Sequence, residues 1–253
     1  MPAWMYQHVA AEAGLGSLDI DATSAGGIWL ARQGGHDGAY IPAATIWTSA
    51  EQLSNPRVVA LQKSLADQQF GALPATVIVA GSLQHRDLSR MAQPVLLNPK
   101  ASPMIGLTAA HLRGGRPHLV QLGALRRFAE EWDLGLALDL TGRLDPTWEA
   151  EAAVTRLGPR LRLIRVRDSA PSRAAVGLDR VACRALHAAL DREHPLVVAI
   201  ASSRMTPFPT TPRAAAIGAI RASDYVYERC RGHLSALREG IGRYEQSRTS
   251  RGA

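Results

Sequence analysis

The sequences LGLALDL, at residues 134–140, and LRLIRVR, at residues 161–167, decide the fold class of this chain. The first run is almost continuously apolar, and the second alternates leucine, isoleucine and valine with arginine. Runs of this length and character are typical of strands buried on both faces of a parallel sheet. The segment between them has the pattern of a loop followed by an amphipathic helix. Together the three parts predict a strand–helix–strand unit of an α/β protein.

The helix between the two runs has clear boundary signals. Asp145 is placed to accept the free backbone N–H groups of a first turn, and Pro146 suits the first helical position. Glu149 and Glu151 would lie near the positive end of the helix dipole, and Gly158 suits the stop. The pattern therefore predicts a helix that starts at Pro146 and ends before Gly158.

The same alternation of strands and helices continues in both directions along the chain. Seven strands are predicted: Leu18–Asp21, Ala44–Trp47, Thr76–Ala80, Pro94–Asn98, Leu134–Asp139, Leu161–Arg167 and Leu196–Ala201. The further predicted helices are Trp4–Ala13, Asn55–Gln69, His118–Trp132, Gly177–Leu190, Pro212–Ala222 and Tyr225–Arg243. Because no internal repeat or interdomain linker stands out, we expect a single barrel-like domain over residues 1–243. Residues 244–253 are expected to form a flexible basic tail.

Composition limits the class of protein. Of 253 residues, 46% are hydrophobic and 20% charged, which is ordinary for a globular protein and argues against disorder, a collagenous repeat or a coiled coil. No apolar run approaches the ~18 residues that a membrane span requires, and the first residues show no signal-peptide pattern. Cys183 and Cys230 are the two cysteines, too few for a disulfide framework or a thiolate zinc site. A reducing, cytoplasmic setting is expected.

The formal net charge of +7 raises the question of nucleic-acid binding. Lys63 and Lys100 are the only lysines, and the arginines are spread from Arg32 to Arg251. A scattered excess of arginine over lysine is more simply explained by GC-rich codon usage than by contacts to phosphates. The charge therefore predicts a mixed basic surface, and neither nucleic acid nor a membrane is expected as a partner.

Several common catalytic motifs are absent from the sequence. It has no G-x-x-x-x-G-K-[ST], H-E-x-x-H or G-x-S-x-G pattern, and the glycines at 14 and 16 are not followed by a glycine at 19. His111 and His118 flank an RGGR loop and are interpreted as polar loop residues. Motifs alone therefore assign no reaction.

The order of elements in LALDLTGRLDPTWEAEAAVTRLGPRLRLIRVRD, residues 136–168, resembles that of the xylose isomerase-like TIM barrels. This superfamily contains sugar phosphate isomerases/epimerases and family-two AP endonucleases. In it, one strand ends Asp-Thr-Gly-His and the next ends His-x-Lys-Asp. The corresponding stretches here are DLTGR at 139–143 and RVRD at 165–168. The resemblance implies a TIM (β/α) barrel that is incomplete, since about seven strands are recognisable and a closed barrel needs eight.

The same motifs bear on cofactors. In the family they hold a divalent metal such as Mn or Mg, and Asp139 and Asp168 match its acidic positions. Arg143 and Arg165 stand where the family has histidines, which puts positive charge where a cation would sit. We therefore expect no metal and no other cofactor.

An ion pair between Asp139 and Arg165 is the hypothesis for what replaces the metal. The two residues end neighbouring predicted strands, and a buried arginine must be paired. The alternative is that the pair only fills the former site.

Other polar residues follow the predicted strand ends, where α/β barrels carry their chemistry. The catalytic candidates are Asp139, His85 as a general base and Lys100 as an amine with a lowered pKa. His85 and Lys100 are also compatible with ordinary solvent-exposed positions. The candidates for binding a phosphorylated or carboxylated substrate are Arg143, Arg165, Arg167, Asp168 and Arg204.

Three functions stay open on the sequence. The resemblance implies a diverged sugar phosphate isomerase or epimerase that acts on, or binds, a small anionic sugar-type ligand. The second is a non-catalytic barrel that serves in binding or assembly, and a homo-oligomer is expected because an open sheet edge favours a partner subunit. The third is an AP-endonuclease-like protein that acts on DNA.

Overall fold

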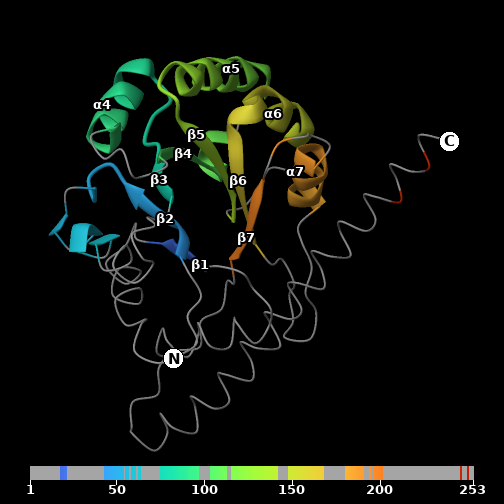
Figure 1. Cartoon of the computed structure of the whole chain (residues 1–253). Helices are drawn as coiled ribbons and strands as arrows, with labels where there is room; N and C mark the ends of the chain where they lie inside the picture. Colours follow the sequence, from blue (N-terminus) through green and yellow to red (C-terminus); the bar gives the residue numbers. More distant parts are fainter. Residues whose placement is uncertain are drawn as a thin grey trace, which may run out of the picture.

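Seven parallel strands form one curled sheet in the computed structural model of this chain (Figure 1). The structure describes residues 18–21, 43–53, 55–56, 58–60, 62–63, 75–96, 103–112, 115–141, 148–167, 180–190, 194, 196–201, 246 and 250. The strands are β1 (Leu18–Asp21), β2 (Ala43–Ser49), β3 (Ala75–Val79), β4 (Pro103–Thr108), β5 (Gly135–Leu140), β6 (Leu161–Arg167) and β7 (Val197–Ala201). Each strand pairs with its neighbour in chain order.

Helices cover the convex side of this sheet (Figure 1). The α-helices are α4 (His85–Leu96), α5 (Gly115–Glu131), α6 (Ala150–Leu157) and α7 (Arg180–Leu190). Two short 3₁₀ helices follow strand β4 and helix α6, and they are η1 (Ala109–Leu112) and η2 (Gly158–Arg160). The α/β class predicted from the sequence is confirmed, and the curled parallel sheet is compatible with a TIM-barrel-like fold.

The alternation of side chains along the strands separates two apolar clusters. On β5, Leu136, Leu138 and Leu140 point outward and are buried beneath the helices. Ala137 points the other way and joins an inner cluster with Trp47, Val77, Met104 and Leu163. Burial on both faces explains why LGLALDL is apolar at nearly every position.

The curl of the sheet is visible in one contact across its concave face. The guanidinium carbon of Arg165, on β6, lies 4.2 Å from the centroid of the Trp47 ring, on β2. Three strands lie between β2 and β6 in the sheet order, so a flat sheet could not bring these side chains together. The concave face is therefore the interior of a barrel-like curve.

One predicted strand is wrong. The segment Pro94–Asn98 was expected to be extended, but α4 continues to Leu96, and the next strand is β4. A short apolar run such as PVLL fits either a strand or a buried helix, and Pro94 misled the prediction because it lies inside the last turn of α4. The true strand contains Gly106, a residue that is depleted in strands.

A close contact explains the glycine in β4. A Cβ atom at Gly106 would lie 2.9 Å from Cζ3 of Trp47 and 2.9 Å from Cγ1 of Val77. The Trp47 ring therefore lies directly on the β4 backbone, and only glycine leaves room for it.

The start of α6 also differs from the prediction. The helix begins at Ala150 with Glu149 at the N-cap and no side-chain cap, while Asp145 and Pro146 lie outside the described residues. Trp148 is buried in the outer core, and we attribute the late start to this packing, which outweighs local capping preference. The predicted stop is confirmed, because Gly158 is the C-cap with φ +59°.

The other predicted elements have mixed outcomes. Strands Leu18–Asp21 and Leu161–Arg167 are confirmed with the expected bounds, and β2, β3, β5 and β7 overlap their predictions. The helix predicted at His118–Trp132 is α5, and the one predicted at Gly177–Leu190 contains α7. Within Asn55–Gln69, residues 56, 58–60, 62 and 63 are helical.

Part of the prediction falls on residues that are not described. The helices expected at Trp4–Ala13, Pro212–Ala222 and Tyr225–Arg243 lie outside the described residues. In the tail expected at 244–253, Gln246 and Ser250 are described, and both are helical. The domain bounds therefore stay a prediction.

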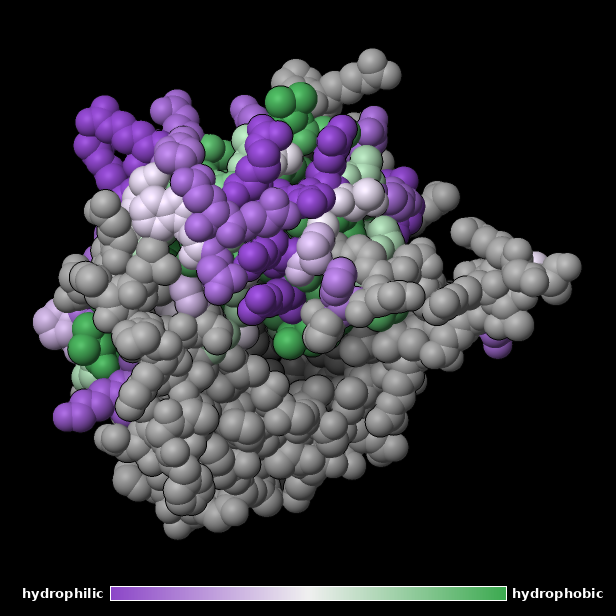
Figure 2. Space-filling model, turned by 45° about the horizontal axis from the view of Figure 1, so that its top comes forward, coloured by the Kyte–Doolittle hydropathy of each residue, from purple (hydrophilic) through white to green (hydrophobic). Residues whose placement is uncertain are grey.

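Hydrophilic side chains gather over the helical layer, as Figure 2 shows. Both signs of charge occur there, and Arg126 and Glu130 of α5 form an ion pair of 2.8 Å. This face has the mixed character expected from the composition rather than a cationic patch. Among the described helices, none offers an apolar stretch of the length that a bilayer crossing needs.

Replacing Gly158 by alanine is expected to destabilise the protein. Gly158 has φ +59° and ψ −152°, a region that is essentially restricted to glycine and costs other residues about 1–3 kcal/mol. The added Cβ would also lie 2.9 Å from Nη1 of Arg126. Urea unfolding of Gly158→Ala should show this loss. The control is Gly123→Ala in α5, where the new Cβ meets nothing within 4 Å and should not destabilise. Equal stability of the two variants would contradict the backbone argument.

Candidate functional site

Polar side chains meet where strands β4, β5 and β6 end. Thr108 pairs in register with Asp139, and Asp139 pairs in register with Arg165. Paired residues of parallel strands point to the same face of a sheet, so these three positions form one row. The carboxyl ends of the strands are where α/β barrels place their active sites. The row is therefore the candidate functional site.

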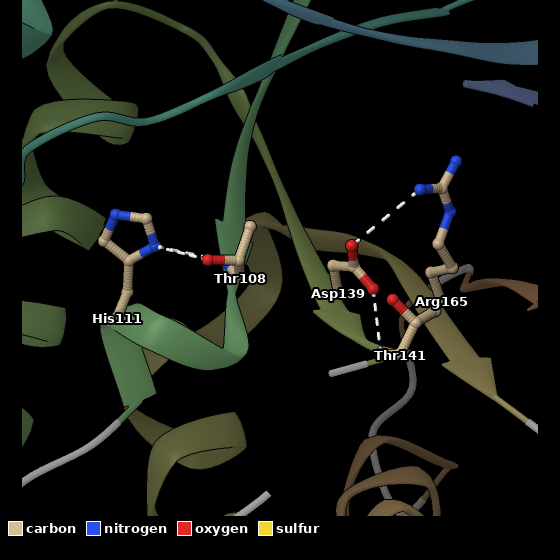
Figure 3. Close-up of polar contacts among 5 residues, drawn as sticks. All are labelled: Thr108, His111, Asp139, Thr141 and Arg165. Carbon is tan, nitrogen blue, oxygen red and sulfur yellow. Dashed lines mark hydrogen bonds and ion pairs between the residues drawn. The ribbon is translucent and has the colours of Figure 1, made fainter. Parts of the chain in front are cut away.

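Arg165 is the centre of this row. It is 6% exposed, and of the side chains that the structure describes it is the only charged one in the buried class. Its guanidinium lies over the Trp47 ring. Its Nη1 is 3.8 Å from Oδ2 of Asp139 (Figure 3). At that distance the pair is electrostatic and not a hydrogen bond. The structure thus brings together the two residues that the sequence analysis paired.

Asp139 is oriented by the backbone that follows it. Its Oδ1 accepts a hydrogen bond of 2.9 Å from the N–H of Thr141, while Oδ2 faces Arg165 (Figure 3). A carboxylate that binds a backbone N–H two residues ahead is a common device at the end of a strand. The carboxylate is therefore held in one orientation beside the cation.

Thr108 and His111 form a second polar pair at the end of β4. Nδ1 of His111 accepts hydrogen bonds from the backbone N–H of Thr108, at 3.2 Å, and lies 3.1 Å from its hydroxyl (Figure 3). Thr108 directly precedes η1, and His111 is its third residue, so the bond back to the Thr108 N–H is one half of a capping box. Sequence analysis interpreted His111 as a polar loop residue. The spacing Thr-x-x-His was the signal that it missed.

The imidazole of His111 favours its neutral form. Burial lowers its pKa from 6.5, and hydrogen bonds to backbone groups of Ala80 and Thr108 act in the opposite direction more weakly. An Nδ1 that accepts a backbone N–H must be unprotonated, so the geometry agrees with this direction. Ala80 follows β3, and His111 therefore links the ends of β3 and β4.

His85 lies in a different environment from the one expected of a general base. It begins α4, is exposed, and its ring meets the edge of Phe128 on α5 with 5.3 Å between centroids. Its other contacts are with Ser89 on the same helix. His85 thus contacts the helical layer and not Asp139 or Arg165. The sequence placed His85 just after a strand. It did not show toward which neighbours the first residue of the following helix would point.

The remaining candidates are not placed by the structure. Lys100, Arg143, Asp168 and Arg204 lie outside the described residues, and for Arg167 only the backbone at the end of β6 is described. Lys100 was expected to follow a strand end. The element that precedes it is helix α4, so this reason for proposing it no longer holds.

The described residues do not fit the divalent metal that the family resemblance implies. Across the described part of the chain, no three His, Cys, Asp or Glu side chains come together as a metal site would need. At the row itself, the carboxylate of Asp139 faces the guanidinium of Arg165, whose positive charge opposes a cation.

Comparison with known proteins gives a weak likeness to aldolases. No family model matches the chain, and no curated protein matches it in sequence. One similar solved structure is described as that of a candidate fructose-1,6-biphosphate aldolase from Coccidioides immitis. It has 9% identity and a TM-score of 0.43, covering 95% of this chain and 96% of that one. Another is the YdjI aldolase from Escherichia coli K12, with 12% identity, a TM-score of 0.43 and 94% of each chain covered.

These comparisons correct the assignment made from the sequence. The xylose isomerase-like resemblance, and the isomerase or epimerase function that it implied, are wrong, since the similar structures are described as aldolases. The resemblance depended on an order of strand, loop, helix and strand that α/β folds share widely. The DNA-acting alternative depended on the same superfamily and is withdrawn with it. TM-scores below 0.5 transfer no activity to this chain.

Replacing His111 by glutamine is expected to reduce the pH dependence of stability. Because the folded-state pKa of His111 is lowered from 6.5, its stabilising contribution is present above that value and is lost as the pH falls through the folded pKa. Glutamine still accepts the N–H of Thr108 but does not titrate. The loss of unfolding free energy between about pH 7.5 and about pH 5 should be smaller in His111→Gln than in wild type.

The matched control for this experiment is His85→Gln, which makes the same substitution at an exposed histidine. Urea unfolding at both pH values measures all three proteins. If His85→Gln changes the pH dependence as much as His111→Gln does, the assignment of the titrating group is wrong.

Proposed function

We propose that this chain binds a small molecule through a phosphate or carboxylate group at the ends of β4, β5 and β6, with Arg165 as the contact to the anion. One observation carries the proposal. A nearly buried guanidinium stands at the strand ends on the concave face, over the Trp47 ring and 3.8 Å from the Asp139 carboxylate. A planar fork of N–H donors is the group that best matches the paired oxygens of these anions.

Packing alone does not require a charge at this position. The residue before Arg165 on the same face of β6 is Leu163, and on β5 the residue before Asp139 is Ala137, both in the inner apolar cluster. Replacing a buried ion pair by apolar residues of similar volume is often neutral or stabilising. A charge kept where an apolar side chain would serve supports a role in binding.

The neighbours of Arg165 suit a ligand that carries hydroxyl groups as well as an anion. Asp139 offers Oδ2 as an acceptor, and Thr108 contributes a hydroxyl from the adjacent register position. Hydrogen bonds and ion pairs are stronger at such partly buried positions than in water. A phosphorylated sugar combines both features, and Asp139 is proposed as the carboxylate that accepts hydrogen bonds from its hydroxyl groups.

Other expectations from the sequence extend this proposal without a structural test. Lys100, Arg143, Arg167, Asp168 and Arg204 stay predictions as further ligand contacts. A cytoplasmic location and a homo-oligomer also stay predictions.

The alternative is that the Asp139 and Arg165 pair only fills the interior of a barrel that serves in binding or assembly elsewhere on its surface. The specific observation in favour is that Asp139 already compensates the charge of Arg165. The two functions differ in what small anions do to the protein.

The test is a titration of the wild-type protein with inorganic phosphate, a three-carbon and a six-carbon sugar phosphate, and a dicarboxylate. Calorimetry gives Kd and thermal unfolding gives Tm. We expect at least one of these anions to bind and to raise Tm. Arg165→Gln should weaken that binding about tenfold or more, because hydrogen bonds to a charged group are worth roughly 1.5–3 kcal/mol.

The matched control is Arg162→Gln, which removes the same charge from an exposed position on the same strand. It should bind the anion as wild type does. Equal weakening in both variants would indicate a general charge effect, and the absence of binding by any of the four probes would leave the structural alternative.

A further inference from the structure

We infer that Trp47 is a positioning residue for the anion site, holding the guanidinium of Arg165 in the orientation that receives a phosphate or carboxylate. The inference rests on the proposed function, because it assigns Trp47 a role only through Arg165. Its basis is the stacking of the guanidinium on the indole ring, at 4.2 Å from the centroid.

Trp47 is fixed in the interior independently of Arg165. Its side chain is 1% exposed and belongs to the inner cluster with Val77, Met104 and Leu163. Its ring also lies on the backbone of β4, because a Cβ atom at Gly106 would be 2.9 Å from Cζ3. The ring is therefore a rigid platform that exists before any ligand binds.

The platform and the carboxylate constrain Arg165 in complementary ways. The Trp47 ring covers one face of the guanidinium, while Asp139 approaches Nη1 from β5. Arginine otherwise loses considerable rotamer entropy when it is ordered on a ligand. Stacking on the ring removes part of that cost before an anion binds, so the ring should improve affinity without touching the anion.

The chemistry of the ring distinguishes a positioning role of Trp47 from a role in core packing alone. A cation is attracted to an aromatic face but not to an aliphatic side chain, and tryptophan is the best of the aromatic residues. Trp47→Phe keeps an aromatic face, whereas Trp47→Leu keeps only apolar volume. Both variants lose packing in the core, so a purely structural role predicts that affinity follows stability in both.

The experiment measures Kd for inorganic phosphate and unfolding free energy in wild type, Trp47→Phe, Trp47→Leu and Arg165→Gln. We expect Trp47→Leu to bind phosphate about tenfold more weakly than wild type, and Trp47→Phe to stay within about threefold. Affinities of the two Trp47 variants that track their unfolding free energies, or a Trp47→Leu protein that binds as wild type does, would overturn the inference.

The outcomes distinguish this inference from the proposed function. If wild type does not bind phosphate or the other anions, both fall. If Arg165→Gln loses binding while Trp47→Leu keeps it, the proposed function stands and only the role of Trp47 is overturned.

A measurement on the wild-type protein covers the case in which Trp47→Leu does not fold. The ring current of Trp47 should move the side-chain proton resonances of Arg165 upfield in the NMR spectrum, and phosphate should shift them further. Arg165→Gln identifies these resonances by their loss. Resonances at ordinary arginine positions in the free protein would show that the guanidinium is not stacked, and would overturn the inference.

Discussion

The guanidinium of Arg165 lies inside the curve of the sheet, over the Trp47 ring and 3.8 Å from the carboxylate of Asp139. The rest of the described structure is arranged so that this contact is possible. The sheet must curl until β2 faces β6, and β4 must carry glycine where the Trp47 ring crosses it. The contact between Arg165 and Trp47 does not constrain the convex face. There the described strands bury leucine, isoleucine and valine beneath the described helices in the usual way of a parallel sheet.

A buried charge costs free energy unless nearby groups compensate for it. Two groups in the described structure contribute: Oδ2 of Asp139 lies 3.8 Å from Nη1 of Arg165, and the quadrupole of the Trp47 ring lies against a face of the guanidinium. Asp139 is itself held by the N–H of Thr141. His111 accepts the backbone N–H of Thr108, and its hydrogen bond to the backbone of Ala80 links the end of β4 to the end of β3. Short links between side chains and backbone therefore fix the polar groups at these strand ends.

Much of the fold could be predicted from the sequence, because periodicity and apolar runs report local structure directly. Strands β1 and β6 were predicted with their observed bounds, and Asp139 and Arg165 were paired because they end neighbouring predicted strands. Strand β4 was missed because its glycine at 106 serves a contact with Trp47, a residue far away in the chain. The role of Trp47 needs the curl of the sheet, which no local pattern encodes. His85 was proposed as a general base because it closely follows a predicted strand. That position in the sequence does not show that its ring packs on Phe128.

The most direct test of this arrangement is a double-mutant cycle on unfolding free energy with Asp139→Asn, Arg165→Met and the double variant. Both side chains are largely buried, with side-chain exposures of 14% for Asp139 and 7% for Arg165, so solvent screens the pair little. We expect Asp139→Asn to destabilise the protein most, because it removes a negative charge from beside a buried cation. The double variant should recover part of that loss, with a coupling of roughly 1–3 kcal/mol. Effects that add to within about 0.5 kcal/mol would contradict the central claim that this pair holds the charge inside the sheet.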